Sequence, residues 1–250
     1  MGNNNNRGSQ RDFCIYCNAL VENGTREHTP PKCCFPKGTE GLITVPACYK
    51  CNNASAKDDE YFRDMIVMSK ECSGHPQAKE PLGKVLRNLD RQESKGLRIR
   101  LADSMRHCLV EYTPGLLEPG MEYSIDLQRI GNVVSKTVKG LLWNDTRLRL
   151  PKRYGIAVVP SINFDFLGPR LMALVAEVEA RERNSASERV SIGNGAFEYW
   201  RTRISSKSNM NSVWLLRFYG GQYFVCFVVP KKEIRNGYFR RAIYEGLIAV

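Results

Sequence analysis

Two pairs of cysteines constrain this chain more than any other feature of its sequence. Cys14 and Cys17 form one CxxC pair, and Cys48 and Cys51 form another, with thirty residues between them. A CxxC turn directs both sulfurs to one side of a tight loop, so two such turns can complete the tetrahedral four-sulfur shell that suits Zn²⁺. A closed shell has no open coordination position. The sequence therefore predicts one structural zinc ion per chain, whose binding energy contributes to folding.

The other cysteines fit a reduced, metal-binding protein better than a disulfide-linked one. The chain holds nine cysteines, an odd number, and its first residues, MGNNNNRGSQRD, lack the apolar core of a signal peptide. We therefore predict that residues 1–12 form a disordered lead and that the protein is cytoplasmic, where disulfides are rare. A redox role for the CxxC pairs fits less well, because no thioredoxin-like βαβ pattern accompanies them. The adjacent Cys33 and Cys34 are interpreted as packing or surface thiols.

The charge of the chain favours a polyanionic partner. The formal net charge is +11; residues 1–80 hold 10 basic and 10 acidic side chains, and residues 81–250 hold 27 and 16. Nucleic acid is the natural partner of such an excess, because each neutralised phosphate releases a counterion, although a merely soluble basic protein is the alternative. No apolar run approaches the roughly 18 residues that span a membrane. The densest basic loop, RLRLPKRYG, supplies candidate phosphate contacts at Arg147, Arg149, Lys152 and Arg153.

Apolar periodicity indicates an α+β fold with two domains. Residues 13–72 form a small cysteine-rich domain, and a stretch with Gly, Pro and Ser separates it from a larger basic domain over residues 82–250. Helices are predicted in these segments: two within 82–112, one over 124–143 and one over 168–183. Strands are predicted over 154–160, 196–204, 213–219 and 222–229. Gly220-Gly221 separates the last two strands, which predicts a hairpin within an antiparallel meander.

Three residues between and directly after the two CxxC pairs are candidates for a catalytic role. Glu27 and His28 lie between the two CxxC pairs, and Asn52 directly follows Cys51. In the order CIYC, EHTPPK, VPACYKCN, the segment from Cys14 to about Phe62 resembles the four-cysteine branch of the HNH endonucleases, the ββα-metal nuclease superfamily. The resemblance implies a small zinc-stabilised ββα-metal (HNH) domain. It also implies a metal-dependent endonuclease that hydrolyses DNA phosphodiester bonds, in bacterial or phage defence, in restriction or in a mobile element.

The resemblance assigns His28 as general base and Glu27 and Asn52 as ligands of a catalytic divalent ion. A neutral imidazole with a pKa near about 6.5 can take a proton from water at physiological pH. Carboxylate and amide oxygens are hard ligands that suit Mg²⁺ or Mn²⁺. Neighbouring residues of a strand point to opposite faces, so Glu27 and His28 need a bend to meet one phosphate. The structural alternatives are a loop histidine for His28 and a helix cap for Asn52.

The sequence also departs from the family pattern. Ile43 stands where the family usually has an Asn that braces the histidine loop, so the brace must come from elsewhere. Lys57 is a candidate phosphate contact, with a solvated helix residue as the alternative. His75 and His107 have no sequence partner that makes either a site, and His107 lies on a helical pattern beside Cys108.

Two other functions stay open from the sequence. A zinc-ribbon nucleic-acid-binding protein without catalysis explains the cysteines and the charge, but not Glu27, His28 and Asn52 together. An RNA-cleaving nuclease explains all of them equally well. Double-stranded DNA is the leading partner, and a second copy of the chain and a regulatory protein are the other candidates; no membrane partner is expected.

Overall fold

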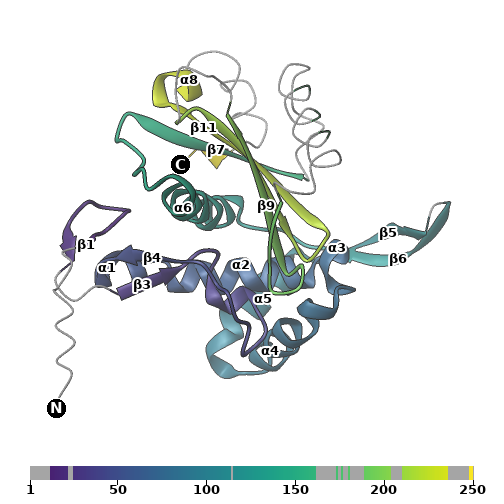
Figure 1. The fold of residues 1–250 in the computed structure, drawn as a ribbon. Helices are drawn as coiled ribbons and strands as arrows, with labels where there is room; N and C mark the ends of the chain where they lie inside the picture. Colours follow the sequence, from purple (N-terminus) through teal and green to yellow (C-terminus); the bar gives the residue numbers. More distant parts are fainter. Residues whose placement is uncertain are drawn as a thin grey trace.

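The computed structural model of the chain is a mixed α+β fold in which all sheets are antiparallel (Figure 1). It describes residues 12–21, 25–113, 115–161, 189–203, 210–235 and 248–249, together with three isolated alanines between residues 162 and 188. The strands are β1 (Asp12–Phe13), β2 (Leu20–Val21), β3 (Thr25–His28), β4 (Thr44–Ala47), β5 (Arg106–Thr113), β6 (Leu116–Glu122), β7 (Tyr154–Pro160), β8 (Val190–Ile192), β9 (Phe197–Arg203), β10 (Ser212–Phe218), β11 (Gln222–Pro230) and β12 (Ile248–Ala249). The helices are α1 (Tyr49–Asn53), α2 (Ala56–Met68), α3 (Lys70–Ser73), α4 (Lys79–Leu89), α5 (Lys95–Ser104), α6 (Leu127–Thr146) and α8 (Lys231–Arg235), with short 3-10 turns at η1 (Lys32–Cys34), η2 (Pro76–Ala78) and η3 (Gln92–Ser94).

The amino-terminal part consists of two short hairpins followed by two helices. Strand β1 pairs with β2, and β3 pairs with β4 so that Glu27 lies opposite Val45 and His28 lies opposite Thr44. Helix α1 begins one residue after Cys48, and α2 follows it after a two-residue turn. The order is therefore two antiparallel strands and then a helical segment.

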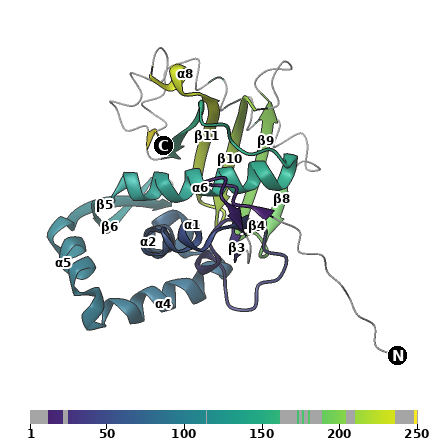
Figure 2. The same ribbon diagram turned by 90° about the vertical axis from the view of Figure 1, so that its left-hand side faces the viewer.

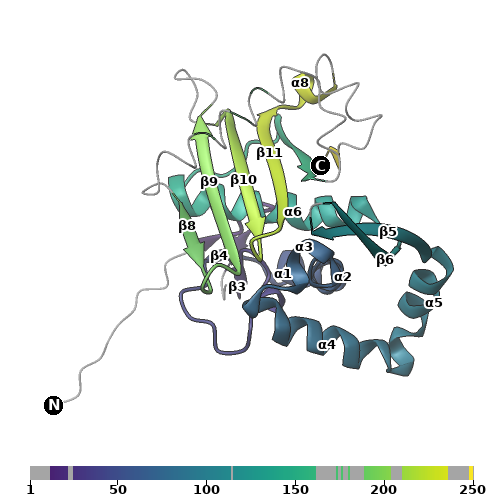
Figure 3. The same ribbon diagram turned by 90° about the vertical axis from the view of Figure 1, so that its right-hand side faces the viewer.

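Six strands form one antiparallel sheet in the order β12-β7-β11-β10-β9-β8 (Figure 3). Strands β10 and β11 pair from Phe218–Gln222 at the turn to Ser212–Val228, and Gly220 takes the left-handed backbone (φ 71°) that this turn requires. The antiparallel meander predicted from the sequence is confirmed. One face of the sheet contributes to an apolar cluster that includes α6, and the other face carries a second cluster that includes Ile234 of α8.

Helix α6 is the long helix predicted from its apolar periodicity, displaced by three residues. It begins after Asp126, whose Oδ1 accepts hydrogen bonds from the N–H groups of Gln128 (3.1 Å) and Arg129 (3.2 Å). It ends at Arg147, which has a left-handed backbone (φ 58°). The helix lies between the sheet on one side and the amino-terminal strands and α2 on the other (Figure 2).

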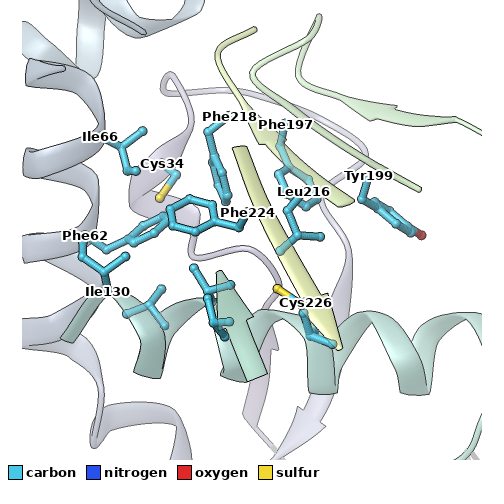
Figure 4. Packing of buried hydrophobic residues seen from close by; sticks show 14 of the residues in the cluster. Cys34, Phe62, Ile66, Ile130, Phe197, Tyr199, Leu216, Phe218, Phe224 and Cys226 are labelled. Atoms are coloured by element: carbon cyan, nitrogen blue, oxygen red, sulfur yellow. The ribbon is translucent and has the colours of Figure 1, made fainter. Parts of the chain in front are cut away.

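One continuous hydrophobic core joins the cysteine-rich segment to the sheet. Phe62 of α2 packs edge-on against Phe218 of β10, with ring centroids 5.1 Å apart, and lies 5.9 Å from Phe224 of β11 (Figure 4). The same cluster includes Cys34 in the β3–β4 connection and Ile130 of α6. The stretch predicted as a domain boundary, residues 72–82, therefore does not separate two hydrophobic cores.

Two helices, α4 and α5, occupy residues 79–104 as predicted, but the helical pattern does not continue to residue 112. His107 and Cys108 lie in strand β5, which forms an isolated two-stranded ribbon with β6 and projects from the body (Figure 1). Prediction of a helix around His107 was therefore wrong. The apolar residues there, such as Leu109, fit a helical spacing. Their conformation is determined by the pairing of β5 with β6, and the spacing of apolar residues does not reveal this pairing.

Several sequence predictions concern residues beyond this description. Of the predicted disordered lead, only Asp12 is described, and it lies in β1. Of the predicted helix over 168–183, only Ala173, Ala176 and Ala180 are described, and they are helical. The aromatic-basic stretch 238–245 lies outside the described residues. Within the part of the chain that is described, no helix is long and apolar enough to cross a membrane.

The contact between α6 and Thr29, the residue that follows strand β3, leaves no space for a side chain on Gly140. A Cβ on Gly140 would lie 2.5 Å from the Thr29 Oγ1 atom and 2.8 Å from the Thr29 Cβ atom. We expect Gly140→Ala to lower the free energy of unfolding by about 1–3 kcal/mol, because overpacking displaces the backbone. Urea denaturation measures this change.

Gly83→Ala is the matched control for this substitution, because Gly83 also lies within a helix, α4. Its nearest neighbour is the flexible Arg87 Nη1 atom at 3.4 Å. We expect this variant to be neutral or up to about 1 kcal/mol more stable, because alanine favours the helix. Equal stability of both variants would contradict the tight contact between α6 and Thr29.

Candidate metal centre and active site

The four cysteines of the two CxxC pairs meet in space. Their Sγ atoms all lie within 4.8 Å of one another, and the Cys17 and Cys48 sulfurs are 3.7 Å apart. A tetrahedral ion with Zn–S bonds of about 2.3 Å separates its sulfurs by roughly 3.8 Å. The four thiols are therefore close enough to bind a metal ion, consistent with a structural zinc. Among the described residues, this is the only such group of His, Cys, Asp and Glu ligands.

Local hydrogen bonds shape the first CxxC turn and attach it to the neighbouring hairpin. The Cys14 N–H donates to the Ala19 carbonyl (2.9 Å), and the Asn18 N–H donates to the Cys14 carbonyl (2.9 Å). Asn18 takes a left-handed backbone (φ 64°), which asparagine tolerates better than most residues. The Ile15 N–H donates to the Pro46 carbonyl of β4 (3.1 Å), so the turn lies against the strand that leads to Cys48.

The second CxxC turn is built into the start of α1. Cys48 caps this helix, and its Sγ accepts a hydrogen bond from the Cys51 N–H at 3.4 Å. This backbone hydrogen bond lowers the pKa of the Cys48 thiol to about 7. The thiolate, which is the form that binds a metal ion, is thus favoured at one of the four positions.

Cys33 and Cys34 lie outside this sulfur group and pack within the protein, in agreement with their interpretation as packing thiols. Cys34 is buried in the main core, and its carbonyl accepts a hydrogen bond from the Tyr219 hydroxyl. The Cys33 thiol donates to the Asp59 carbonyl at 3.4 Å. The adjacent Cys33 thiol and burial both raise the pKa of Cys34, so the Cys34 thiol stays protonated.

Strand β3 directs Glu27 and His28 to different surroundings. Glu27 is 5% exposed, whereas the His28 side chain is half-buried, as expected for neighbours on opposite faces of a strand. No bend separates them, since both belong to the regular pairing with β4. Burial, followed by the charge of Lys32, lowers the pKa of the His28 imidazole below its ordinary value, so the neutral form prevails at physiological pH.

Glu27 faces the interior, where its partner is Lys136 of α6. The Lys136 Nζ atom lies 3.0 Å from Glu27 Oε2. Burial raises the pKa of the Glu27 carboxyl, and the lysine opposes this rise. Lys136 also donates a hydrogen bond to Ser55 Oγ, and the Ser55 hydroxyl donates to Asp59 Oδ2 at 3.0 Å. Glu27 is thus part of a polar chain between α6 and α2.

A comparison of the chain with protein-family models, curated proteins and solved structures found no match. The function must therefore be argued from the residues of the site. Within this site, the group of four cysteine sulfurs is the feature that the structure supports most directly.

The Ile43 side chain cannot form the hydrogen bond that an Asn would make to the histidine segment. Main-chain atoms and helix α6 hold this segment instead. The Thr29 N–H donates to the Ile43 carbonyl at 3.0 Å, and the Thr29 hydroxyl donates to the Thr137 carbonyl of α6 at 3.0 Å. Thr29 is 1% exposed and directly follows His28. These two hydrogen bonds position the segment that carries the histidine.

Asn52 and Lys57 follow the second CxxC turn in different positions. Asn52 lies within α1, where its N–H donates to the Cys48 carbonyl at 2.9 Å, and its side chain is half-buried. Helix α1 lies beside β3, so Asn52 belongs to the element next to Glu27 and His28. Lys57 is exposed in the first turn of α2, and its carbonyl accepts a hydrogen bond from Arg129 at 2.6 Å.

The basic loop after α6 lies beside the first CxxC turn. The Arg149 guanidinium stands 5.3 Å from the centre of the Phe13 ring, next to Cys14. Arg147 lies over Trp143 at 4.4 Å, and Arg153 lies 5.8 Å from the Tyr154 ring. Arg147, Arg149, Lys152 and Arg153 are all exposed. The structure thus brings this loop, distant in sequence, to the cysteine-rich segment.

Sequence reasoning missed Lys136, Ser55 and Asp59. Their residue types are ordinary on helix surfaces, and only the packing of α6 against β3 and α2 makes them neighbours of Glu27.

We expect the purified chain to hold about one zinc ion that resists mild chelation. Cys48→Ser removes one ligand, so this variant is expected to lose both the zinc and the folded structure. Elemental analysis and circular dichroism measure the two effects. Cys108→Ser, which changes a half-buried thiol outside the sulfur group, should keep both. A zinc-free preparation that stays folded would show that the ion is not structural.

Proposed function

We propose that this protein is a metal-dependent endonuclease of the HNH type that hydrolyses phosphodiester bonds in DNA. The proposal rests on one observation above all. Four cysteine sulfurs within 4.8 Å of one another join the β1–β2 turn to the start of α1, the helix that carries Asn52 and lies beside the strand of Glu27 and His28. Two strands and a helix in this order are the arrangement that the sequence resemblance implies for an HNH domain.

His28 has the properties of a general base. It is half-buried, so water can reach it, and its lowered pKa keeps the imidazole unprotonated at neutral pH. An unprotonated imidazole can accept a proton from the attacking water. The hydrogen bonds of Thr29 to Ile43 and Thr137 limit the movement of the adjacent backbone.

Glu27 and Asn52 are the proposed ligands of the catalytic Mg²⁺ or Mn²⁺. The donor set fits a hard divalent ion, because it offers a carboxylate and an amide oxygen on adjacent elements. When bound, such an ion supplies charge neutralisation at the phosphate and the leaving oxygen. The role of the chain is to hold the carboxylate on β3 and to keep the histidine beside it on the same strand.

The basic loop supports DNA as the substrate. Arg147, Arg149, Lys152 and Arg153 are exposed beside the first CxxC turn, where they can contact phosphates on either side of the cleavage point. A nuclease of this kind would act in bacterial or phage defence, in restriction or within a mobile element. A second copy of the chain would supply the second cut of a double-strand break.

A zinc-dependent nucleic-acid-binding protein without catalysis is the second candidate. The observation that favours it is the position of Glu27, which is buried in an ion pair with Lys136 on the opposite face of β3 from His28. In that case Glu27 joins helix α6 to the hairpin and has no part in hydrolysis.

Incubation of supercoiled plasmid with Mg²⁺ or Mn²⁺ separates the two functions. We expect wild-type protein to nick the plasmid and His28→Ala to do so at least about 100-fold more slowly, which is the usual loss when a general base is removed. His107→Ala, at an exposed histidine of the β5–β6 ribbon, should cleave like wild type. Wild-type protein that binds the plasmid but leaves it intact with every metal would contradict the nuclease.

The dependence of the cleavage rate on pH gives a second measure of His28. Its pKa is lowered below 6.5, so the base is neutral, and the rate is high, at and above that pH. The rate should fall as the pH drops through the lowered pKa, and His28→Ala should lack this fall. An RNA substrate assayed in parallel tests the RNA alternative.

The basic loop should govern binding to the DNA backbone. We expect Lys152→Gln with Arg153→Gln to weaken binding of any duplex sequence and to reduce the slope of log affinity against log salt by about 2, since about 0.9 counterions are released per phosphate contact. Fluorescence anisotropy at several salt concentrations measures both. Arg91→Gln with Lys95→Gln, which changes two exposed basic residues after helix α4, should leave the slope unchanged.

A further inference from the structure

Two buried carboxylates share one lysine between helices α2 and α6. Lys136 Nζ lies 3.0 Å from Glu27 Oε2 and donates a hydrogen bond to Ser55 Oγ, which in turn donates to Asp59 Oδ2 at 3.0 Å. Burial raises the pKa of both Glu27 and Asp59, Lys136 opposes this rise at each carboxyl, and the charge of Asp59 adds to the rise at Glu27. Tyr16 closes one side, with its ring centre 5.6 Å from the lysine Nζ.

This polar cluster, formed by Tyr16, Glu27, Ser55, Asp59 and Lys136, holds two carboxylates against one ammonium, and its buried Tyr16 hydroxyl has no hydrogen-bond partner among the described residues. Asp59 is only 9% exposed, and within the described part of the chain its buried Oδ1 atom has no hydrogen-bond partner. A buried carboxylate oxygen without a partner is costly, so its position calls for a cation or a donor. One ammonium group cannot neutralise two carboxylates.

We infer that Asp59 and Glu27 together hold the catalytic divalent ion and that Lys136 is the ammonium that offsets one of their two charges when the ion is absent. The inference rests on the proposed function, which assigns Glu27 but not Asp59 to the ion. Asp59 supplies the oxygen that has no partner, and a second carboxylate increases the affinity of an oxygen site for Mg²⁺ or Mn²⁺.

The charges of the complete site balance. Two carboxylates and one ammonium carry a net charge of about −1, and a divalent ion with one phosphodiester adds about +1, which leaves the buried site neutral. Without the lysine, the same complex would carry about −1 in a place that water reaches poorly. Lys136 therefore competes with the ion for the carboxylates and also keeps the substrate-bound site neutral.

Mn²⁺ binding to zinc-loaded, full-length protein tests the inference without any measurement of cleavage. Titration calorimetry, with Mn²⁺ electron paramagnetic resonance as a second readout, gives the dissociation constant. We expect Asp59→Asn to weaken Mn²⁺ binding at least about tenfold, and Lys136→Met to tighten it by a similar factor, because loss of a ligand or of a competing cation changes metal affinity by 10–100-fold.

Glu60→Gln is the matched control, since it removes one negative charge from the exposed residue next to Asp59. It should bind Mn²⁺ like wild type. The inference is overturned if wild type does not bind Mn²⁺ outside the zinc site, if Asp59→Asn binds as tightly as wild type, or if Glu60→Gln weakens binding equally. Where Asp59→Asn fails to fold by circular dichroism, Lys136→Met decides: unchanged or weaker binding overturns the inference.

Failure of this inference can be told apart from failure of the proposed function. If the protein binds Mn²⁺ through Asp59 but leaves plasmid intact, the proposed metal site is supported and the proposed nuclease activity is refuted. If cleavage depends on His28 but has the same Mn²⁺ dependence in wild type and Asp59→Asn, the nuclease activity is supported and Asp59 is not a ligand of its metal ion.

Discussion

The packing of helix α6 against the β3–β4 hairpin and the adjoining Thr29 is the contact on which the rest of the structure depends. Gly140 lets the helix approach Thr29 closely, and the Thr29 hydroxyl then reaches the Thr137 carbonyl. The same approach brings Lys136 to Glu27. On its other side, α6 covers the six-stranded sheet. The helix thereby fixes the cysteine-rich hairpins relative to the largest element of the fold.

The fold was predictable where local pattern and tertiary environment agree. The strands from residue 154 and from residue 213 onward are short, apolar and bounded by turn residues, and the structure confirms them. The β5–β6 ribbon was not predictable, because its exposed leucines carry a spacing that fits a helix equally well. The shared core was missed for another reason: a Gly- and Pro-containing connection resembles a domain linker, although the helices on either side bury their apolar faces together.

The candidate site shows the same division. The group of four cysteines was predictable, because each CxxC spacing brings two sulfurs to one side of a local turn. Glu27 and His28 were recognisable as a pair, but the direction of each side chain depends on the pairing of β3 with β4. Lys136, Ser55 and Asp59 carried no signal of their own, since a charged residue on a helix gives no indication of which distant residue it meets.

The buried ion pair between Glu27 and Lys136 limits how the cysteine-rich segment can be transferred to another protein. A cysteine-rich segment excised at residue 72 would leave behind the lysine, the Thr137 acceptor and the aromatic partners of Phe62. Zinc would still close the two CxxC turns, yet the carboxylate on β3 would face solvent instead of an ammonium group. The segment is therefore not an independent folding unit: its folded form depends on helix α6, and the two parts must change together.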